Sequence, residues 1–227
     1  MKHEMRRIHP WALGLAGLLL VSWSQSAQAQ IFGSDPEGIQ QTEKLIDRAD
    51  DLVKEGVKAR GQIQKTLDSY NSLFSPDTQD LTSVYKDVEK GMNDCAKQKE
   101  EVQKRIDEMS AQADTYFAGW GSSLKNIQTA SLRQRSEERM KETRERFNGI
   151  LAAAREAQAA YDPFMTHMKD QWTYLGHDLN ASGVASLKPD ADKLNQEAQE
   201  LFKKIDEGLD RSNNYISSLR SEKPPSE

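Results

Sequence analysis

The sequence is poor in the residues that interrupt helices and in those that build a thick core. Its 227 residues include 13 glycines and 7 prolines, and only 36% are hydrophobic. The mean hydropathy is -0.81, and 30% of the residues are charged. This composition excludes a thick globular core. It favours long helices that each bury one narrow apolar stripe, with disorder as the competing interpretation.

Cysteine occurs once, at Cys95. A single thiol cannot form an internal disulfide, so two interpretations remain. Cys95 either forms a bridge to another molecule or senses redox conditions, or it is a free cysteine buried as a small apolar side chain. The apolar periodicity described below includes Cys95 and therefore favours the buried free thiol.

A long hydrophobic run is also missing. The strongest apolar run, residues 11–21, has about 11 residues, whereas ~20 are needed to span a bilayer. Basic residues precede this run, and residues 27–29 (AQA) offer the small side chains that a signal peptidase recognises. We therefore expect residues 1–29 to be a signal peptide that is cleaved after Ala29, and the protein to be periplasmic. An uncleaved membrane anchor is the alternative.

Positive charge is in deficit. The formal net charge is -5, and removal of residues 1–29, with three basic residues and one glutamate, changes it to -7. An anionic protein is a poor partner for nucleic acid, so we expect no nucleic-acid binding. The same charge gives only weak support to contact with a membrane of anionic lipids.

What the sequence does contain is helical periodicity. Apolar residues recur at alternating spacings of three and four, and this pattern predicts helices over about 36–74, 77–127, 131–179 and 189–219. The pattern of the second helix is that of a coiled coil, and only Lys99 is charged in it. Pro163 lies inside the third helix and is expected to kink it without ending it. Residues 180–187 (NASGVASL) are predicted to be a loop.

Long helices joined by short turns must pack side by side to bury their apolar stripes. We predict an all-α fold, an elongated antiparallel coiled-coil helical bundle of three long helices plus a shorter fourth. The bundle forms one domain over residues 36–219, after a short segment at 30–35 and before a flexible tail at 220–227. Because the helix lengths differ, part of the long hairpin is expected to project or to pair with a second copy as a homodimer.

The sequence offers little catalytic chemistry. It contains no nucleophile elbow, phosphate-binding loop, zinc-type cysteine pair or EF-hand spacing. His167 and His177 are ten residues apart, about 15 Å along a helix, which is too far for one metal ion. His177 lies beside the predicted loop and is interpreted as a structural cap for the loop backbone. We therefore predict a protein that is not an enzyme and has no metal or cofactor.

One stretch is unusually charged. Residues 133–146 carry six basic and four acidic side chains. Glu137 with Lys141, and Glu142 with Arg146, have the favourable acid-first order at a spacing of four, which contributes ~0.3 to 0.5 kcal/mol per pair. Arg135 and Arg139 have no acid in that position before them. These two arginines are therefore the candidate contact for an anionic group or a partner.

The same stretch, SLRQRSEERMKETRERF at residues 131–147, resembles the most typical segment of an uncharacterised bacterial family, domain-of-unknown-function family 2959. Further similar segments are LIDRA at 45–49, RID at 105–107 and HDLNASGVASL at 177–187. The resemblance covers nearly the whole mature chain. It implies a helical protein and carries no activity, ligand or catalytic residue with it.

These observations lead to three functional hypotheses. The favoured one is a non-enzymatic coiled-coil protein of the cell envelope, a periplasmic scaffold or partner-binding protein whose envelope partner is unknown. The first alternative is a membrane-remodelling or lipid-binding helical bundle. The second alternative is a periplasmic holdase-type chaperone.

Overall fold

A computed structural model describes residues 37–221 of the chain. The predicted signal peptide, the segment at 30–35 and the tail from residue 222 lie outside the described residues. Within residues 37–221 the protein has helices and no strand, which confirms the all-α prediction. The helices are α1 (Glu37–Ser72), α2 (Leu81–Leu124), α3 (Ala130–Leu175), α4 (Ala181–Ser186) and α5 (Lys188–Ser221).

The start of α2 differs from the prediction. The sequence suggested a helix from Asp77, but α2 begins at Leu81 and its N-cap is Asp80, whose carboxylate accepts a hydrogen bond from the Ser83 N–H at 2.9 Å. The backbone N–H of Asp77 is instead bound to the Ser75 hydroxyl at 3.3 Å. Ser75 and Asp77 therefore bond to each other within the turn, and the helix begins after Asp80, which caps it.

The segment predicted as a loop at 180–187 forms the short helix α4. Asn180 caps it, because its side-chain oxygen accepts hydrogen bonds from the N–H groups of Ser182 and Gly183 at 2.9 and 3.0 Å. A Cβ atom at Gly183 would lie 2.1 Å from the carbonyl oxygen of Asp178, so this close approach requires glycine. Glycine was read from the sequence as a sign of a loop, whereas here it allows a tight helical turn.

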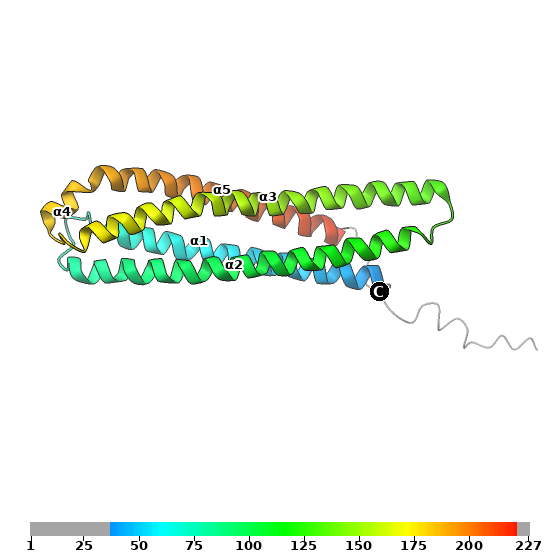
Figure 1. The fold of residues 1–227 in the computed structure, drawn as a ribbon, viewed down its shortest axis with the longest axis horizontal. Coiled ribbons are helices and arrows are strands. Elements are labelled where there is room, and N and C mark those ends of the chain that lie inside the picture. Colours follow the sequence, from blue (N-terminus) through cyan, green and yellow to red (C-terminus); the bar gives the residue numbers. More distant parts are fainter. Residues whose placement is uncertain (1–36, 222–227) are drawn as a thin grey trace, which may run out of the picture. The chain divides into compact units, whose positions relative to one another are not determined.

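The four long helices pack side by side as two antiparallel pairs (Figure 1). α1 pairs with α2, α3 pairs with α5, and the two pairs meet along α1–α5 and α2–α3. Between α1 and α5, the guanidinium of Arg60 donates to both carboxylate oxygens of Asp206 at 2.6 and 3.0 Å. Between α2 and α3, the indole N–H of Trp172 donates to the carbonyl of Tyr85 at 3.2 Å.

Helix α3 continues through Pro163, as predicted. The next residue, Phe164, is fully buried. Helix α3 therefore tolerates the hydrogen bond that Pro163 removes, because the helix is packed both before and after this residue.

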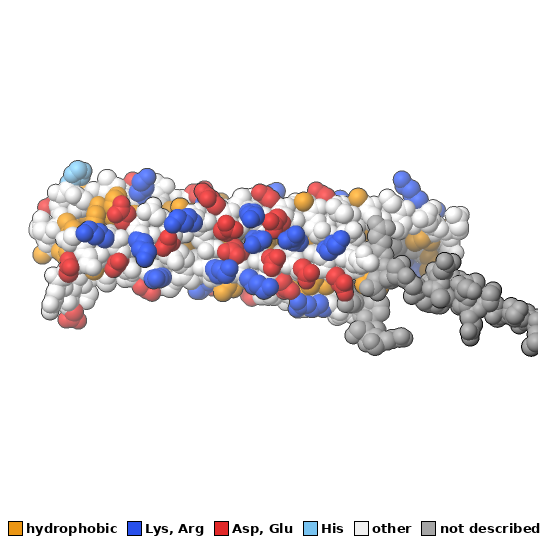
Figure 2. Space-filling view, turned by 90° about the horizontal axis from the view of Figure 1, so that it is seen from below, with side chains coloured by type: hydrophobic (Ala, Val, Ile, Leu, Met, Phe, Trp, Pro, Cys, Tyr) orange, Lys and Arg blue, Asp and Glu red, His pale blue; other side chains and the backbone are white. Residues whose placement is uncertain are grey.

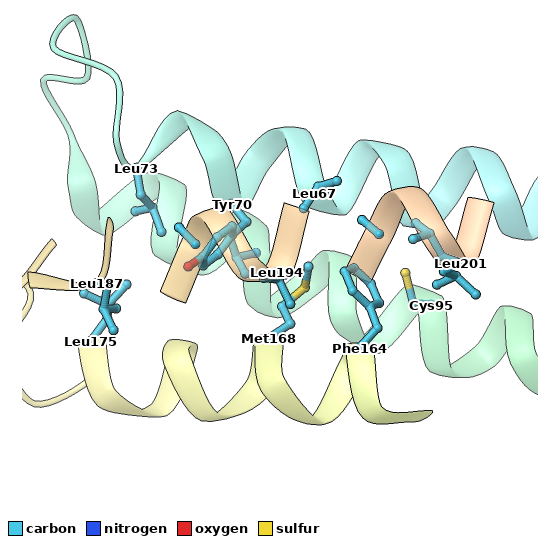
Figure 3. Packing of buried hydrophobic residues seen from close by; sticks show 14 of the residues in the cluster. Leu67, Tyr70, Leu73, Cys95, Phe164, Met168, Leu175, Leu187, Leu194 and Leu201 are labelled. Carbon is cyan, nitrogen blue, oxygen red and sulfur yellow. The ribbon is translucent and has the colours of Figure 1, made fainter. Parts of the chain in front are cut away.

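The buried side chains form two separate clusters along the bundle. The first cluster lies toward the α1–α2 turn and contains Tyr70, Phe164 and Leu194 (Figure 3). The second cluster lies toward the other end and contains Leu45, Phe147 and Ile216. Burial of each such large apolar side chain stabilises the fold by about 1.5 to 3 kcal/mol, so each cluster contributes strongly to folding.

The outer faces of the helices are polar. On the face shown in Figure 2, Lys and Arg side chains are interspersed with Asp and Glu. Arg48 lies 3.3 Å from Glu108, and Lys188 lies 2.7 Å from Asp192. Exposed pairs of this kind contribute about 0 to 1 kcal/mol each. None of the helices within residues 37–221 combines the length and the apolar character that a bilayer crossing requires.

Candidate functional site

The far end of the α2–α3 hairpin extends beyond the end of α5. The rings of Phe147 in α3 and Tyr215 in α5 are 6.4 Å apart, which sets the register of this antiparallel pair. The last residue of α5, Ser221, is therefore about level with residue 141 of α3. Since α3 begins at Ala130, its first turns have no part of α5 opposite them (Figure 1).

The start of α1 shows which residues of α2 lie at this end of the bundle. The amide of Gln112 donates to the side-chain oxygen of Gln41 at 2.8 Å. The first turns of α1 also line a small pocket together with Gly119, Trp120 and Ser123 of α2, so α1 begins beside the last turns of α2. We refer to residues 118–140, which start beside the first turn of α1 and continue past the described end of α5, as the hairpin end.

The two helices remain in contact within the hairpin end. The indole N–H of Trp120 donates to the Ser136 hydroxyl at 2.9 Å. Leu124, at the last residue of α2, is buried. The hairpin end is therefore a paired extension of two helices, in contrast to the four-helix region, which we call the body.

Both candidate arginines lie in the hairpin end. Arg135 and Arg139 are exposed, and Leu132, one turn before Arg135, is 47% exposed. Residues 118–140 contain four basic and two acidic side chains, although the chain as a whole has a charge of -5. Of the acids, Glu138 accepts a hydrogen bond from Gln134 at 3.0 Å. The hairpin end is thus a locally positive surface that also exposes a large apolar side chain.

The ion pairs expected in the charged stretch differ in detail. Lys141 lies 3.9 Å from Glu145, in the following turn, rather than pairing with Glu137. Arg146 donates through Nε to the main-chain carbonyl of Glu142 at 3.5 Å. The acid paired with Lys141 therefore follows the lysine, which is the reverse of the acid-first order.

Cys95 belongs to the body. It is 1% exposed, and its sulfur lies 3.3 Å from the Thr66 hydroxyl of α1. Removal from water disfavours the thiolate, and this burial raises the pKa of the Cys95 thiol above its ordinary value. The thiol is therefore neutral at physiological pH, which makes it a poor nucleophile.

The two histidines lie on the surface, apart from each other. Nδ1 of His167 is 2.8 Å from Oε2 of Glu197 in α5, so its carboxylate partner is not the neighbouring Asp170. His177 is exposed just after α3, and its main-chain N–H donates to the carbonyl of Tyr174 at 3.2 Å. The side chain that caps α4 is Asn180. Within residues 37–221, no group of three or more His, Cys, Asp or Glu side chains is arranged to hold a metal ion.

A cavity that the sequence analysis did not anticipate separates the two clusters. It has a volume of about 110 Å³ and is lined by α1, α2, α3 and α5. Its walls include small residues from three of these helices, namely Gly56, Ala59, Ala153, Ala154, Ala157 and Gly208. The signal in the sequence is this recurrence of alanine and glycine at one level of facing helices. It was missed because such residues fit an apolar stripe without revealing how much space they leave.

A groove between α2 and α3 runs beside the cavity. It has a volume of about 1110 Å³, and its apolar wall includes Met92, Met165 and Trp172. Lys99 and Tyr161 line both the groove and the cavity, so they form the boundary between the two. The Lys99 ammonium lies 2.6 Å from Asp162 and 5.5 Å from the centre of the Tyr161 ring.

A buried carboxylate lies close to the same level. Glu55 in α1 is buried and accepts a hydrogen bond from Gln98 of α2, which also lines the cavity. This hydrogen bond, together with the nearby Lys58, lowers the pKa of Glu55 below its ordinary value, against the opposing effect of burial. Burial raises the pKa of Tyr161, whose hydroxyl therefore remains protonated.

The two regions offer different binding chemistry. The hairpin end presents guanidinium donors and an exposed leucine. The cavity presents apolar surface with one ammonium group at its boundary.

Comparisons with known proteins give one match. Neither the curated proteins nor the solved structures include a match to this chain. The model of a family described as proteins of unknown function (DUF2959) matches residues 34–219. The match spans almost all of the described helices and extends well beyond the charged stretch on which the resemblance was first noted. The chain belongs to the DUF2959 family.

Proposed function

We propose that this protein is a non-enzymatic, exported coiled-coil protein of the bacterial cell envelope that binds an acidic protein partner through its hairpin end. The observation that carries the proposal is the extension of α2 and α3 beyond the described parts of α1 and α5, with Arg135, Arg139 and Leu132 exposed on it. A paired extension with excess positive charge is suited to contact with a negatively charged surface, and Leu132 can add apolar contact beside it.

The compartment follows from the sequence. The basic start, the short apolar run at 11–21 and the small residues at 27–29 together support export and cleavage after Ala29. The mature chain is then a periplasmic protein. Because we find no catalytic motif in the sequence, we assign the protein a binding function at its surface.

The chemistry of the hairpin end defines the partner. Arginine forms paired hydrogen bonds with carboxylates, and arginine is favoured at protein interfaces. An exposed leucine adds apolar contact beside those charges. The partner that fits is a protein segment with two or more carboxylates next to an apolar side chain.

Site-specific photocrosslinking tests this proposal. A photoreactive amino acid is placed at Leu132 in the full chain and, as a matched control, at Val57, which is 55% exposed on α1 in the body. In living cells, we expect a discrete adduct to another protein from position 132 and none from position 57. Arg135→Gln combined with Arg139→Gln should abolish the adduct at 132.

Three results would contradict the proposal. Equal adducts from both positions would show that the hairpin end is not a preferred contact. The complete lack of an adduct at 132, or an adduct with the mass of two copies of this chain, would exclude the acidic partner at this surface.

A further inference from the structure

We propose that the central cavity binds a small organic carboxylate whose apolar tail of about four to six carbons fills the space between the two clusters and whose carboxylate pairs with Lys99. This site lies in the body and does not depend on the proposed partner contact at the hairpin end. It gives the protein a second, small-molecule binding function.

The first argument is the chemistry of the cavity. Its lining combines the small residues with large apolar side chains such as Leu52, Val102, Ile150 and Leu201. Apolar cavities of about 150 Å³ remain dry and bind small hydrocarbons such as benzene. The cavity in this protein has a volume of about 110 Å³ and is partly open to solvent rather than sealed. Its apolar lining still offers water few hydrogen-bond partners, so a short hydrocarbon chain suits it better than water.

The second argument is the position of the space. Each cluster is closely packed on its own, with Phe164 and Leu201 in the first and Phe147 and Ile216 in the second. The helices between them carry Gly56 on α1, Ala157 on α3 and Gly208 on α5. A Cβ atom at Gly208 would meet its nearest neighbour, the Cβ of Ala153, at 3.7 Å, which is an ordinary contact. A larger residue could thus be accepted at Gly208, whereas a Cβ atom at Gly56 would lie 2.9 Å from Cδ2 of Leu209. The unfilled space is therefore evident at Gly208 rather than at Gly56.

The third argument is the charge at the boundary. Among the described residues that line the cavity, Lys99 is the one charged side chain, and it also faces the α2–α3 groove, whose walls carry five carboxylates and two further lysines. Its present partner, Asp162, is 61% exposed, and Lys99 itself is 40% exposed. An ion pair with this exposure is weak, so exchange of Asp162 for the carboxylate of a ligand costs little.

The geometry then defines the ligand. The tail enters between Lys99 and Tyr161 and contacts the small residues of α1, α3 and α5. The carboxylate stays at the groove side, near the Lys99 ammonium and in reach of water. A long acyl chain exceeds the cavity, and a dicarboxylate would bring a second charge into an apolar space, which is unfavourable.

The experiment measures the binding of butanoate, hexanoate, octanoate and the neutral analogue hexanol to the mature protein by ligand-observed NMR titration. We expect saturable one-to-one binding, tightest for hexanoate. Ala157→Leu, which fills the cavity, should weaken hexanoate binding at least tenfold. Ala152→Leu, on the exposed face of the same helix, should leave it unchanged.

Two further variants keep the result interpretable. Gly208→Ala adds one methyl group without a close contact and should weaken hexanoate binding several-fold, even if Ala157→Leu fails to fold. Lys99→Gln should weaken hexanoate binding several-fold and leave hexanol binding unchanged. Thermal denaturation of each variant identifies those that are folded.

The proposal is overturned if none of the three carboxylates saturates the wild-type protein. It is also overturned if folded Ala157→Leu or Gly208→Ala binds hexanoate as well as Ala152→Leu does. Equal loss of hexanoate and hexanol in Lys99→Gln would remove the carboxylate pairing.

Discussion

The body and the hairpin end use the same kinds of residue for different purposes. Phe164 in the body is 1% exposed because it lies inside the four-helix region, whereas Leu132 in the hairpin end is 47% exposed because, within residues 37–221, only α2 lies opposite α3 there. The number of helices at a given level thus decides whether an apolar side chain stabilises the fold or remains available for contact. Stability should reside in the body, and binding to a protein partner should reside in the hairpin end.

The largest difference is expected for truncation of apolar side chains. Phe164→Ala removes a ring from the first cluster and should lower the free energy of unfolding by about 3 to 5 kcal/mol. Leu132→Ala should change it by about 0.5 kcal/mol or less, because the side chain is on the surface and nearly half exposed to water. Urea denaturation of both variants measures the difference, and equal losses would break the comparison between the two regions.

Two glycines of α2 offer a sharper comparison at the level of one methyl group. A Cβ atom at Gly91, in the body, would lie 2.6 Å from the hydroxyl of Thr66 and 2.8 Å from its methyl group, whereas a Cβ atom at Gly119, in the hairpin end, would meet nothing within 4 Å. Gly91→Ala should therefore lower the free energy of unfolding by about 1 to 3 kcal/mol. Gly119→Ala should raise it by up to ~1 kcal/mol, because alanine favours the helix.

The two glycine variants are compared by thermal and urea denaturation. Opposite signs of the change are the expected result. A loss of stability in Gly119→Ala similar to that in Gly91→Ala would mean that the hairpin end is as closely packed as the body.

Much of the fold could be predicted from the sequence. Periodicity located the four long helices, because the spacing of apolar residues is a local property of each helix. In α2 it also selected Val88, Cys95 and Met109, which are buried. In α1 the apolar spacing also includes Val57, four residues after Val53, yet Val57 is 55% exposed. Periodicity identifies a face of a helix, whereas burial depends on which helices lie opposite.

The candidate site was less predictable for the same reason. Arg135 and Arg139 could be selected, because the residues four positions before them can be read directly from the sequence. The cavity could not, since it arises from Gly56, Ala157 and Gly208, which come from three helices and meet only in the folded protein. The pairing of His167 with Glu197 in α5 is likewise a contact between distant segments.

A pH-dependent effect is expected in the body. Because the pKa of Glu55 is lowered in the folded protein, its ionised form stabilises the fold at pH values above the unfolded pKa, which is about 4.3. This stability is lost as the pH falls through the lower, folded pKa. Gln98→Met removes the main hydrogen-bond donor and should make the free energy of unfolding less dependent on pH below about 5.

Urea denaturation between about pH 3 and pH 6 measures this effect. Gln158→Met is the matched control, because Gln158 also lines the cavity but donates to Gln103 at 2.6 Å rather than to Glu55. The control should follow the wild-type dependence. An identical pH dependence of Gln98→Met and wild type would exclude the Gln98 hydrogen bond as a cause of the acid sensitivity.

The smallest effect on stability is expected for the arginines, and it provides the most direct test of the account. The double variant Arg135→Gln, Arg139→Gln is examined for its free energy of unfolding and for photocrosslinking from position 132 in cells. We predict a free energy within about 0.5 kcal/mol of wild type, together with loss of the adduct. Retention of the adduct at full yield, or a loss of stability comparable to that of Phe164→Ala, would contradict the assignment of the hairpin end as the binding surface.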